Sequence, residues 1–268
     1  QGYKVYLADA IKKNVNIPVI CVGSIREPEF AEKILMDGKA DFIAIGRGML
    51  ADPEWLNKAS EGREDDICRC VNCFYCSSRY PSGIRCAVNP ACGREKDFVN
   101  KTSDVKKKVM VIGGGPAGME AARIATLRGH DVSLYEMEQE LGGQLNLAAA
   151  LHLKDKLRWI RDYFATQINK LNIKVELGVK VNSKLVETEK PDVIIIATGA
   201  KPWIPSIPGV EKTVTAGEVL DGRTEFRGKK IAILGGGMVG VETAEFLAEK
   251  GNDVTIVSTK TNIALDME

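Results

Sequence analysis

The feature that most constrains the fold of this chain is a glycine-rich pattern that occurs twice. Both copies have the spacing G-x-G-x-x-G, and their first glycines are 122 residues apart. The glycines are Gly113, Gly115 and Gly118 in the first copy and Gly235, Gly237 and Gly240 in the second. Each copy follows a short apolar run and precedes a helical pattern, so backbone N–H groups and the helix dipole would face a pyrophosphate. The duplication predicts two Rossmann-like dinucleotide-binding units in an α/β chain.

The two copies differ at the end of their second strand. Counting 23 residues from the first glycine reaches Glu136 in the first copy, where a carboxylate can accept hydrogen bonds from ribose hydroxyls. The same count in the second copy reaches Ser258. Because a serine would not repel a 2′-phosphate and Lys260 could approach it, the second copy favours NADPH slightly over NADH.

A cysteine array lies upstream of the first glycine pattern. Its spacing is C-x2-C-x2-C-x9-C, and its members are Cys70, Cys73, Cys76 and Cys86. Bacterial iron–sulfur segments use close spacing of this kind, because three thiolates on one loop can bind three corners of a cubane while a fourth arrives from further along. The alternative is a four-cysteine zinc site, which usually has a second C-x2-C pair. The spacing favours a cluster over zinc, and either over disulfides.

The N-terminal region contains a second candidate phosphate site. Residues 17–50 alternate strand, helix and strand with short turns, which predicts parallel α/β architecture. The turns after the two strands contain Gly23 and Ser24 in one case and Gly46 and Arg47 in the other. Backbone N–H groups at two such turns can converge on one phosphate, as they do in many TIM barrels. The alternative is that the glycines only permit tight turns.

Other elements follow from the apolar patterns. Helices are expected over 27–36, 119–128, 153–170 and 241–250, and strands over 109–112, 132–135, 173–177, 192–199 and 231–234. Since the chain begins inside an amphipathic helix and ends just after the second strand of a nucleotide-binding unit, we expect it to be an interior fragment of a larger protein.

Composition limits the partners. The net charge of +1 gives no reason to expect a nucleic acid, and no apolar run approaches the roughly 20 residues of a membrane span. We therefore expect neither a nucleic-acid nor a membrane partner. The chain has seven cysteines and no signal-peptide pattern, which favours a cytoplasmic protein whose thiols stay reduced and free to bind metal.

Taken together, these motifs resemble the NADH:flavin oxidoreductase family that contains 2,4-dienoyl-CoA reductase, enoate reductase and trimethylamine dehydrogenase. The resemblance covers essentially the whole chain. It rests on the Gly23-Ser24 turn, the segments 44–47 and 50–55, the cysteine array with the following Ala87-Val-Asn-Pro90, and both glycine patterns. The resemblance implies the C-terminal part of an FMN-binding TIM barrel related to old yellow enzyme, a [4Fe-4S] loop segment, and Rossmann-like FAD and NAD(P) binding units.

The resemblance also implies domain boundaries and site residues. The segments are the barrel fragment at 1–66, the cluster segment at 67–103, an incomplete FAD domain at 104–228 and the truncated start of an NAD(P) domain at 229–268. The implied ligands are Gly23, Ser24, Gly46 and Arg47 for the FMN phosphate; Cys70, Cys73, Cys76 and Cys86 for the cluster; Gly113, Gly115, Gly118, Glu136, Gly143 and Gln144 for FAD; and Gly235, Gly237 and Gly240 for NAD(P)H. The substrate-facing catalytic residues are expected in earlier barrel strands, outside this chain.

The implied function is an electron relay. A nicotinamide delivers a hydride, whereas a cubane passes one electron at a time, so flavins must flank the cluster. We expect electrons to pass from NAD(P)H to FAD, the cluster and FMN, and then to an activated C=C bond of an enoate or 2,4-dienoyl-CoA type small molecule. The fragment alone should be inactive.

Two other functions remain open. The cysteine triplet has two residues in its second gap, as in the trimethylamine dehydrogenase branch, whereas dienoyl-CoA reductases resemble C-x2-C-x3-C. One alternative is therefore an amine dehydrogenase that donates electrons to a soluble carrier protein. The other is a non-catalytic electron-transfer or zinc-stabilised module. A homo-oligomeric state is compatible with all three.

Overall fold

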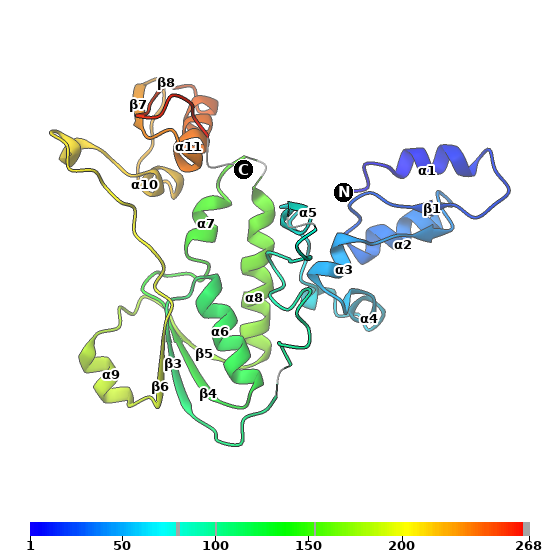
Figure 1. The fold of residues 1–268 in the computed structure, drawn as a ribbon, viewed down its shortest axis with the longest axis horizontal. Coiled ribbons are helices and arrows are strands. Elements are labelled where there is room, and N and C mark those ends of the chain that lie inside the picture. The colour runs from blue at the N-terminus through cyan, green and yellow to red at the C-terminus, as the bar shows by residue number, and fades with distance from the viewer. Residues whose placement is uncertain (79–80, 100, 153, 265–268) are drawn as a thin grey trace. The chain divides into compact units, whose positions relative to one another are not determined.

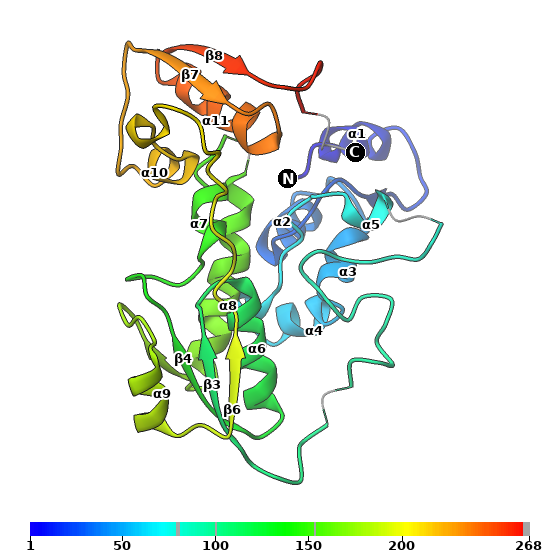
Figure 2. The same ribbon diagram turned by 60° about the vertical axis from the view of Figure 1, so that its left-hand side comes forward.

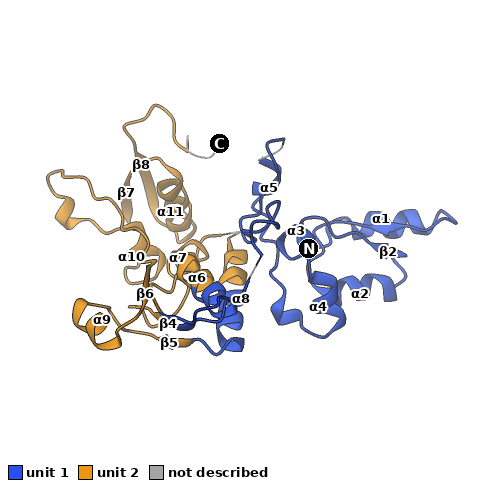
Figure 3. Cartoon of the chain, turned by 60° about the horizontal axis from the view of Figure 1, so that its bottom comes forward, with its two compact units in different colours: residues 1–108, 122–132, 162–173 blue, residues 109–121, 133–161, 174–268 orange. Residues whose placement is uncertain are grey.

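The structure, a computed structural model, describes residues 1–78, 81–99, 101–152 and 154–264. The chain divides into two compact units, which Figure 3 shows in separate colours. Unit 1 contains residues 1–108, 122–132 and 162–173, and unit 2 contains residues 109–121, 133–161 and 174–268.

The first part of unit 1 alternates helices with short strands (Figure 1). Its elements are α1 (Val5–Lys12), β1 (Ile20–Cys21), α2 (Pro28–Met36), β2 (Phe42–Ile43), α3 (Arg47–Ala51), α4 (Trp55–Ser60) and the 3-10 helix η1 (Glu64–Asp66). β1 and β2 pair in parallel, with Ile20 opposite Phe42 and Cys21 opposite Ile43. The predicted order of strand, helix and parallel strand is confirmed, although both strands are shorter than the apolar runs that predict them.

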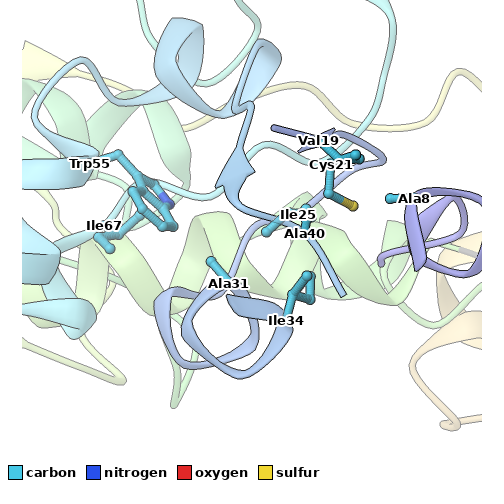
Figure 4. Close-up of a cluster of buried hydrophobic side chains, with 9 residues drawn as sticks. All are labelled: Ala8, Val19, Cys21, Ile25, Ala31, Ile34, Ala40, Trp55 and Ile67. Atoms are coloured by element: carbon cyan, nitrogen blue, oxygen red, sulfur yellow. The ribbon is translucent and has the colours of Figure 1, made fainter. Parts of the chain in front are cut away.

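Nine buried side chains form the core of this region, and Figure 4 shows them. They are Ala8, Val19, Cys21, Ile25, Ala31, Ile34, Ala40, Trp55 and Ile67. Trp55 is buried, and its indole Nε1–H donates a 3.1 Å hydrogen bond to the carbonyl of Arg26. Burial raises the pKa of the Cys21 thiol. Cys21 is therefore a protonated core residue and not a reactive thiol.

A second sheet has the strand order β5-β4-β3-β6. Its strands are β3 (Lys108–Ile112), β4 (Asp131–Tyr135), β5 (Lys174–Glu176) and β6 (Val193–Ile196). β3 pairs in parallel with β6, from Val109 opposite Val193 to Ile112 opposite Ile196, and β4 pairs in parallel with β5. Figure 2 shows β3 next to β4 and β6. A first strand flanked on both sides by later strands is the order expected of a Rossmann-like unit.

The helices that follow the first glycine pattern agree closely with the sequence. α6 (Pro116–Leu127) begins directly after Gly115, and Pro116 occupies its first position, where a missing N–H costs no helical hydrogen bond. The helix predicted over 153–170 is present as η2 (Asp155–Leu157) followed by α8 (Arg158–Lys170). Leu153 lies outside the described residues.

The second glycine pattern is also part of a strand–helix–strand unit. β7 (Lys230–Leu234) pairs in parallel with β8 (Asp253–Val257), and α11 (Met238–Glu249) connects them. The remaining elements are α5 (Tyr75–Ser78), α7 (Gln144–Ala148), α9 (Ser183–Glu189), the 3-10 helix η3 (Val210–Lys212) and α10 (Ala216–Leu220). In the part of the chain that the structure describes, no helix combines the length and apolarity needed to cross a membrane.

Candidate functional site

A cavity of about 220 Å³ lies at the ends of β1 and β2 in unit 1. Because parallel strands end at the same edge of a sheet, the turns that follow them meet there. All four residues predicted to hold the FMN phosphate line this cavity: Gly23, Ser24, Gly46 and Arg47. The structure therefore brings the two predicted turns together at one site.

Positive charge and one buried donor make this cavity suitable for a phosphate. Lys4, Arg26 and Arg47 all line it. Arg47 Nη2 donates a weak 3.4 Å hydrogen bond to Ser24 Oγ, while Arg47 Nη1 is buried and has no hydrogen-bond partner among the described residues. A buried guanidinium N–H without a partner is costly unless an anion satisfies it. The residues present thus fit the phosphate of FMN.

Two further residues line the same cavity and come from the cysteine segment. They are Cys70 and Asn72. Sequence patterns assigned Cys70 to the cluster and gave Asn72 no role. Their position makes the predicted cluster segment a wall of the predicted phosphate site.

Two points of the cysteine segment, at Cys68 and Asn89, are hydrogen-bonded to the C-terminal end of α3. Asp52 Oδ2 accepts hydrogen bonds from the backbone N–H of Cys68, at 2.8 Å, and from Lys58 Nζ, at 2.6 Å. Further along, Asn89 Nδ2 donates to the carbonyl of Leu50 at 2.9 Å. Asp52 is 4% exposed, and its ion pair with Lys58 balances its negative charge where water does not reach it.

The described cysteines of the segment form no disulfide, and Cys70 and Cys73 lie close enough to Cys86 to affect its charge. Burial raises the pKa of Cys86, the nearby Cys70 and Cys73 raise it further, and hydrogen bonds from the backbone of Val88 and Asn89 oppose this rise. Amide donors to a sulfur ligand also tune the potential of an iron–sulfur cluster. Soft thiolate donors on one loop fit either a cluster or zinc.

Cys92 is a further member of this group that sequence patterns left without a role. It is 3% exposed, and its burial, followed by the neighbouring Cys86, Glu95 and Cys76, raises the pKa of its thiol. Among the described residues, no group of three or more His, Cys, Asp or Glu side chains is arranged to hold a metal ion. The predicted ligand roles of the cysteines therefore stay predictions.

The first glycine pattern depends on close backbone approach. A Cβ at Gly118 would lie 1.8 Å from the carbonyl oxygen of Gly113, so only glycine allows α6 to start so near β3. Gly113 has a φ of 111°, and a Cβ there would lie 2.4 Å from the carbonyl oxygen of Ala197, which follows β6. These contacts keep the turn narrow enough for its amides to face a pyrophosphate.

Glu136 lies at the end of β4 and faces the same turn. Its Oε2 accepts a 2.5 Å hydrogen bond from Gly114 N–H, and its Oε1 accepts one of 2.9 Å from Glu138 N–H. The side chain is buried, which favours these short bonds. The structure thus holds the predicted ribose-binding carboxylate against the glycine turn.

Gly143 and Gln144 lie near the turn as well. The backbone N–H of Gly142 donates to the carbonyl of Gly114 at 2.9 Å, which brings the start of α7 to the pattern. Gln144 Nε2 donates to the carbonyl of Ala200 at 2.9 Å, just beyond β6. The six predicted FAD residues are therefore gathered where β3, β4 and β6 end.

The second glycine pattern repeats this geometry. A Cβ at Gly240 would lie 2.0 Å from the carbonyl oxygen of Gly235, which matches the contact between Gly118 and Gly113. Gly237 precedes α11 as its N-cap. Ser258 lies opposite Gly236, since an added Cβ at Gly236 would be 2.9 Å from Ser258 Oγ.

Two sequence families match the chain. Residues 107–268 match the pyridine nucleotide-disulphide oxidoreductase family, and residues 2–66 match the NADH:flavin oxidoreductase / NADH oxidase family. Since the first match covers more than half of the sequence, the chain belongs to the pyridine nucleotide-disulphide oxidoreductase family, with a flavin oxidoreductase segment before it. The predicted family, α/β fold class and oxidoreductase class are confirmed. The combination implies the FMN, FAD, NAD(P)H and [4Fe-4S] cofactors that the motifs predict.

Individual relatives match this chain across both segments. An NADH oxidase of Thermoanaerobacter brockii is 50% identical over 100% of this chain and 43% of its own length. A cinnamate reductase of Clostridium sporogenes is 38% identical over 95% and 39%, and an N,N-dimethylglycine/sarcosine dehydrogenase of Chromohalobacter salexigens is 33% identical over 94% and 39%. A solved structure of 2-naphthoyl-CoA reductase with 2-naphthoyl-CoA has a TM-score of 0.92 and 34% identity, over 99% of this chain and 41% of that one.

The chain is short beside these proteins. It spans 43% of the length of the NADH oxidase and 39% of the length of the cinnamate reductase. The activity, substrate and partners of the whole protein are therefore matters for proposal.

Proposed function

We propose that the whole protein is an NAD(P)H-dependent iron–sulfur flavoprotein that reduces an activated C=C bond next to a carboxylate or thioester. Relatives named cinnamate reductase and 2-naphthoyl-CoA reductase support this substrate class, because both names denote an unsaturated acid or its CoA thioester. When bound, pyridine nucleotide and flavins supply hydride transfer, and a cluster supplies single-electron transfer.

One observation carries the proposal. The cavity formed by Gly23, Ser24, Gly46 and Arg47 also has Cys70 in its wall. Electron transfer between a flavin and a cluster requires that the two groups lie close together, and the position of Cys70 supports such an arrangement. In a chain whose cysteines bound only structural zinc, nothing would require a ligand cysteine to line a phosphate site.

The residues of this chain then have defined tasks. Arg47 and the backbone of Gly23 and Gly46 bind the FMN phosphate, and the thiols of the cysteine array bind the cluster. Glu136 holds the first glycine turn in shape for FAD. The second glycine pattern binds NAD(P)H.

The test is composition and turnover of the full-length protein, purified without oxygen. We expect iron, acid-labile sulfide, FMN and FAD in stoichiometric amounts, and oxidation of NADH or NADPH that depends on cinnamate or a 2-enoyl-CoA. Stoichiometric zinc without iron would contradict the proposal. Should a protein that holds the cluster and both flavins fail to turn over with either substrate, only the C=C assignment would be contradicted.

An amine dehydrogenase that passes electrons to a soluble carrier protein is the second candidate. The relative named N,N-dimethylglycine/sarcosine dehydrogenase and the C-x2-C-x2-C spacing favour it. The intact second glycine pattern favours the reductase, because an amine dehydrogenase needs no nicotinamide site. Bleaching of the flavin absorbance by a secondary or tertiary amine, but not by NADH or NADPH, would decide for the dehydrogenase.

A further inference from the structure

Two residues of the cysteine segment have backbone conformations that side chains rarely adopt. Asn72 has a φ of 57° and Phe74 has a φ of 59°. Asparagine tolerates this left-handed region, but a bulky residue such as phenylalanine is an outlier there. Such conformations cost free energy and persist only where surrounding contacts hold them. Asn72 lines the phosphate cavity of unit 1, and Phe74 contacts Arg47, which also lines it.

Phe74 contacts the arginine of the cavity. Arg47 Cζ lies 4.3 Å from the centre of the Phe74 ring, which is a cation–π geometry. Phe74 is 59% exposed, so burial in a core does not hold its ring in this place. The residue lies directly after Cys73 and directly before α5, which contains Cys76. An arginine held by phosphate would therefore hold the ring, and with it the backbone between two cysteines.

Asn72 contacts the serine of the cavity and a cysteine at the same time. Its Nδ2 lies 3.5 Å from Ser24 Oγ, and its Oδ1 accepts a hydrogen bond from Cys70 Sγ at 3.6 Å. Both contacts are long, and Asn72 itself lines the cavity. Its side chain spans from a predicted phosphate ligand to a predicted cluster ligand.

We propose that Asn72 and Phe74 are positioning residues that couple the phosphate cavity to the cysteine segment, so that a flavin phosphate and the metal centre bind cooperatively. The identity of the two ligands rests on the proposed function. Phosphate bound at Arg47 and Ser24 holds these two residues in place, and they in turn hold Phe74 and Asn72. The positions of Phe74 and Asn72 then fix the strained backbone that carries Cys70, Cys73 and Cys76. By thermodynamic reciprocity, loss of the metal centre weakens FMN binding by the same factor.

The experiment measures how fast the full-length protein, depleted of FMN, loses iron to a chelator with and without added ligand. FMN is compared with riboflavin, which has the same ring system and no phosphate. In the wild type we expect saturating FMN to slow iron loss by about fivefold or more, and riboflavin to have much less effect. Phe74→Leu and Asn72→Gly should lose most of the protection by FMN. Glycine tolerates a positive φ, so Asn72→Gly removes the side chain without adding strain.

Two further variants separate coupling from general damage. Phe74→Tyr keeps an aromatic ring over Arg47 and should keep the protection. Phe98→Leu removes a ring that makes the same kind of contact, since Arg94 Cζ lies 4.7 Å from the centre of the Phe98 ring. Arg94, unlike Arg47, does not line the cavity. This control should behave as the wild type does.

The proposal is overturned if FMN slows iron loss equally in the wild type, Phe74→Leu and Asn72→Gly, or if riboflavin protects as well as FMN. Should the purified protein contain zinc, the proposed function fails, and the same assay with zinc release still tests the coupling. The two failures are therefore distinguishable.

Discussion

At the residue scale, the two copies of the glycine pattern differ most clearly in the side chain that faces the residue between the first two pattern glycines. Glu136 accepts a hydrogen bond from Gly114 N–H, whereas Ser258 occupies the corresponding place beside Gly236. The count from the first glycine predicts this correspondence. Sequence gives no reason, however, to expect the contacts of Asn72 or the positive φ of Phe74, because both depend on how a loop without periodicity packs.

Ser258→Asp should shift the nucleotide preference toward NADH. A carboxylate there can accept hydrogen bonds from ribose hydroxyls and repels a 2′-phosphate. We expect the ratio of kcat/KM for NADH to that for NADPH to rise about tenfold, the size of one hydrogen bond to a charged group. The measurement is steady-state oxidation of each nucleotide by the full-length enzyme. Ser258→Ala serves as the control, and an unchanged ratio in Ser258→Asp would argue against this place as the ribose site.

At the element scale, α8 is tied to the end of the barrel segment within unit 1 by one buried carboxylate. Asp66 Oδ1 accepts hydrogen bonds from Lys170 Nζ and Gln167 Nε2, both at 2.9 Å. Burial acts to raise the pKa of Asp66, but the hydrogen bonds from Lys170 and Gln167 outweigh it and hold the pKa below its ordinary value. Asp66 thus stabilises the fold in its ionised form.

Asp66→Asn should lower the free energy of unfolding of unit 1 by about 1.5 kcal/mol at pH 7, the lower end for a charged hydrogen bond because Lys170 is half exposed. A lowered folded pKa means that the full difference from the wild type is present above the unfolded pKa of about 3.9. The difference then shrinks as the pH falls through the folded pKa. Urea unfolding followed by tryptophan fluorescence at pH 7, 5 and 3 measures it.

The neighbouring Asp65 is exposed and gives a matched control for this change. Asp65→Asn should leave the unfolding curve within about 0.5 kcal/mol of the wild type, as most surface substitutions do. A pH-independent loss in Asp66→Asn would contradict the role of its ionised form.

The strands and long helices were accessible from periodicity, whereas several short helices were not. α9 and α10 each begin at a side-chain cap. Asn182 accepts a hydrogen bond from the backbone N–H of Leu185, and Thr215 and Glu218 form a capping box. The T-x-x-E spacing at 215–218 is a recognised start signal that the apolar pattern alone did not use. Short helices of this kind bury few residues, so their hydrophobic signal is weak.

At the scale of the whole molecule, the chain contains two nucleotide-binding patterns of the same construction. The order of these patterns and their parallel strands was predictable, because each depends on a local strand–turn–helix sequence. The boundaries at 66, 103 and 228 stay predictions, as do an oligomeric state and a carrier partner. The compact units follow contacts between distant segments, for example of residues 162–173 with the N-terminal part, and no local pattern encodes these.

Paired substitutions at Gly118 and Gly240 test whether the two patterns serve different cofactors. In Gly118→Ala the new Cβ would meet the Gly113 carbonyl at 1.8 Å, and in Gly240→Ala the Gly235 carbonyl at 2.0 Å. Backbone atoms cannot move away cheaply, so each change should distort its own turn, at a cost of about 1–3 kcal/mol.

We expect Gly118→Ala to lower the FAD content of the purified full-length protein at least tenfold. Gly240→Ala should keep its FAD and raise the KM for NAD(P)H at least tenfold. Flavin analysis by chromatography and nucleotide titration measure the two effects, and each variant is the control for the other. Loss of FAD in both variants to the same degree would contradict separate roles.

The attachment of Cys68 and Asn89 to the same short stretch, Leu50 to Asp52, has a consequence for how such a segment can evolve. Because Cys68 and Asn89 are attached next to each other, the residues between them behave as a closed loop. The length of this loop can vary at a small cost in free energy. Each doubling of such a loop costs only about 0.6 kcal/mol. Insertions there can reshape the surroundings of a metal centre while its anchorage to the barrel is preserved.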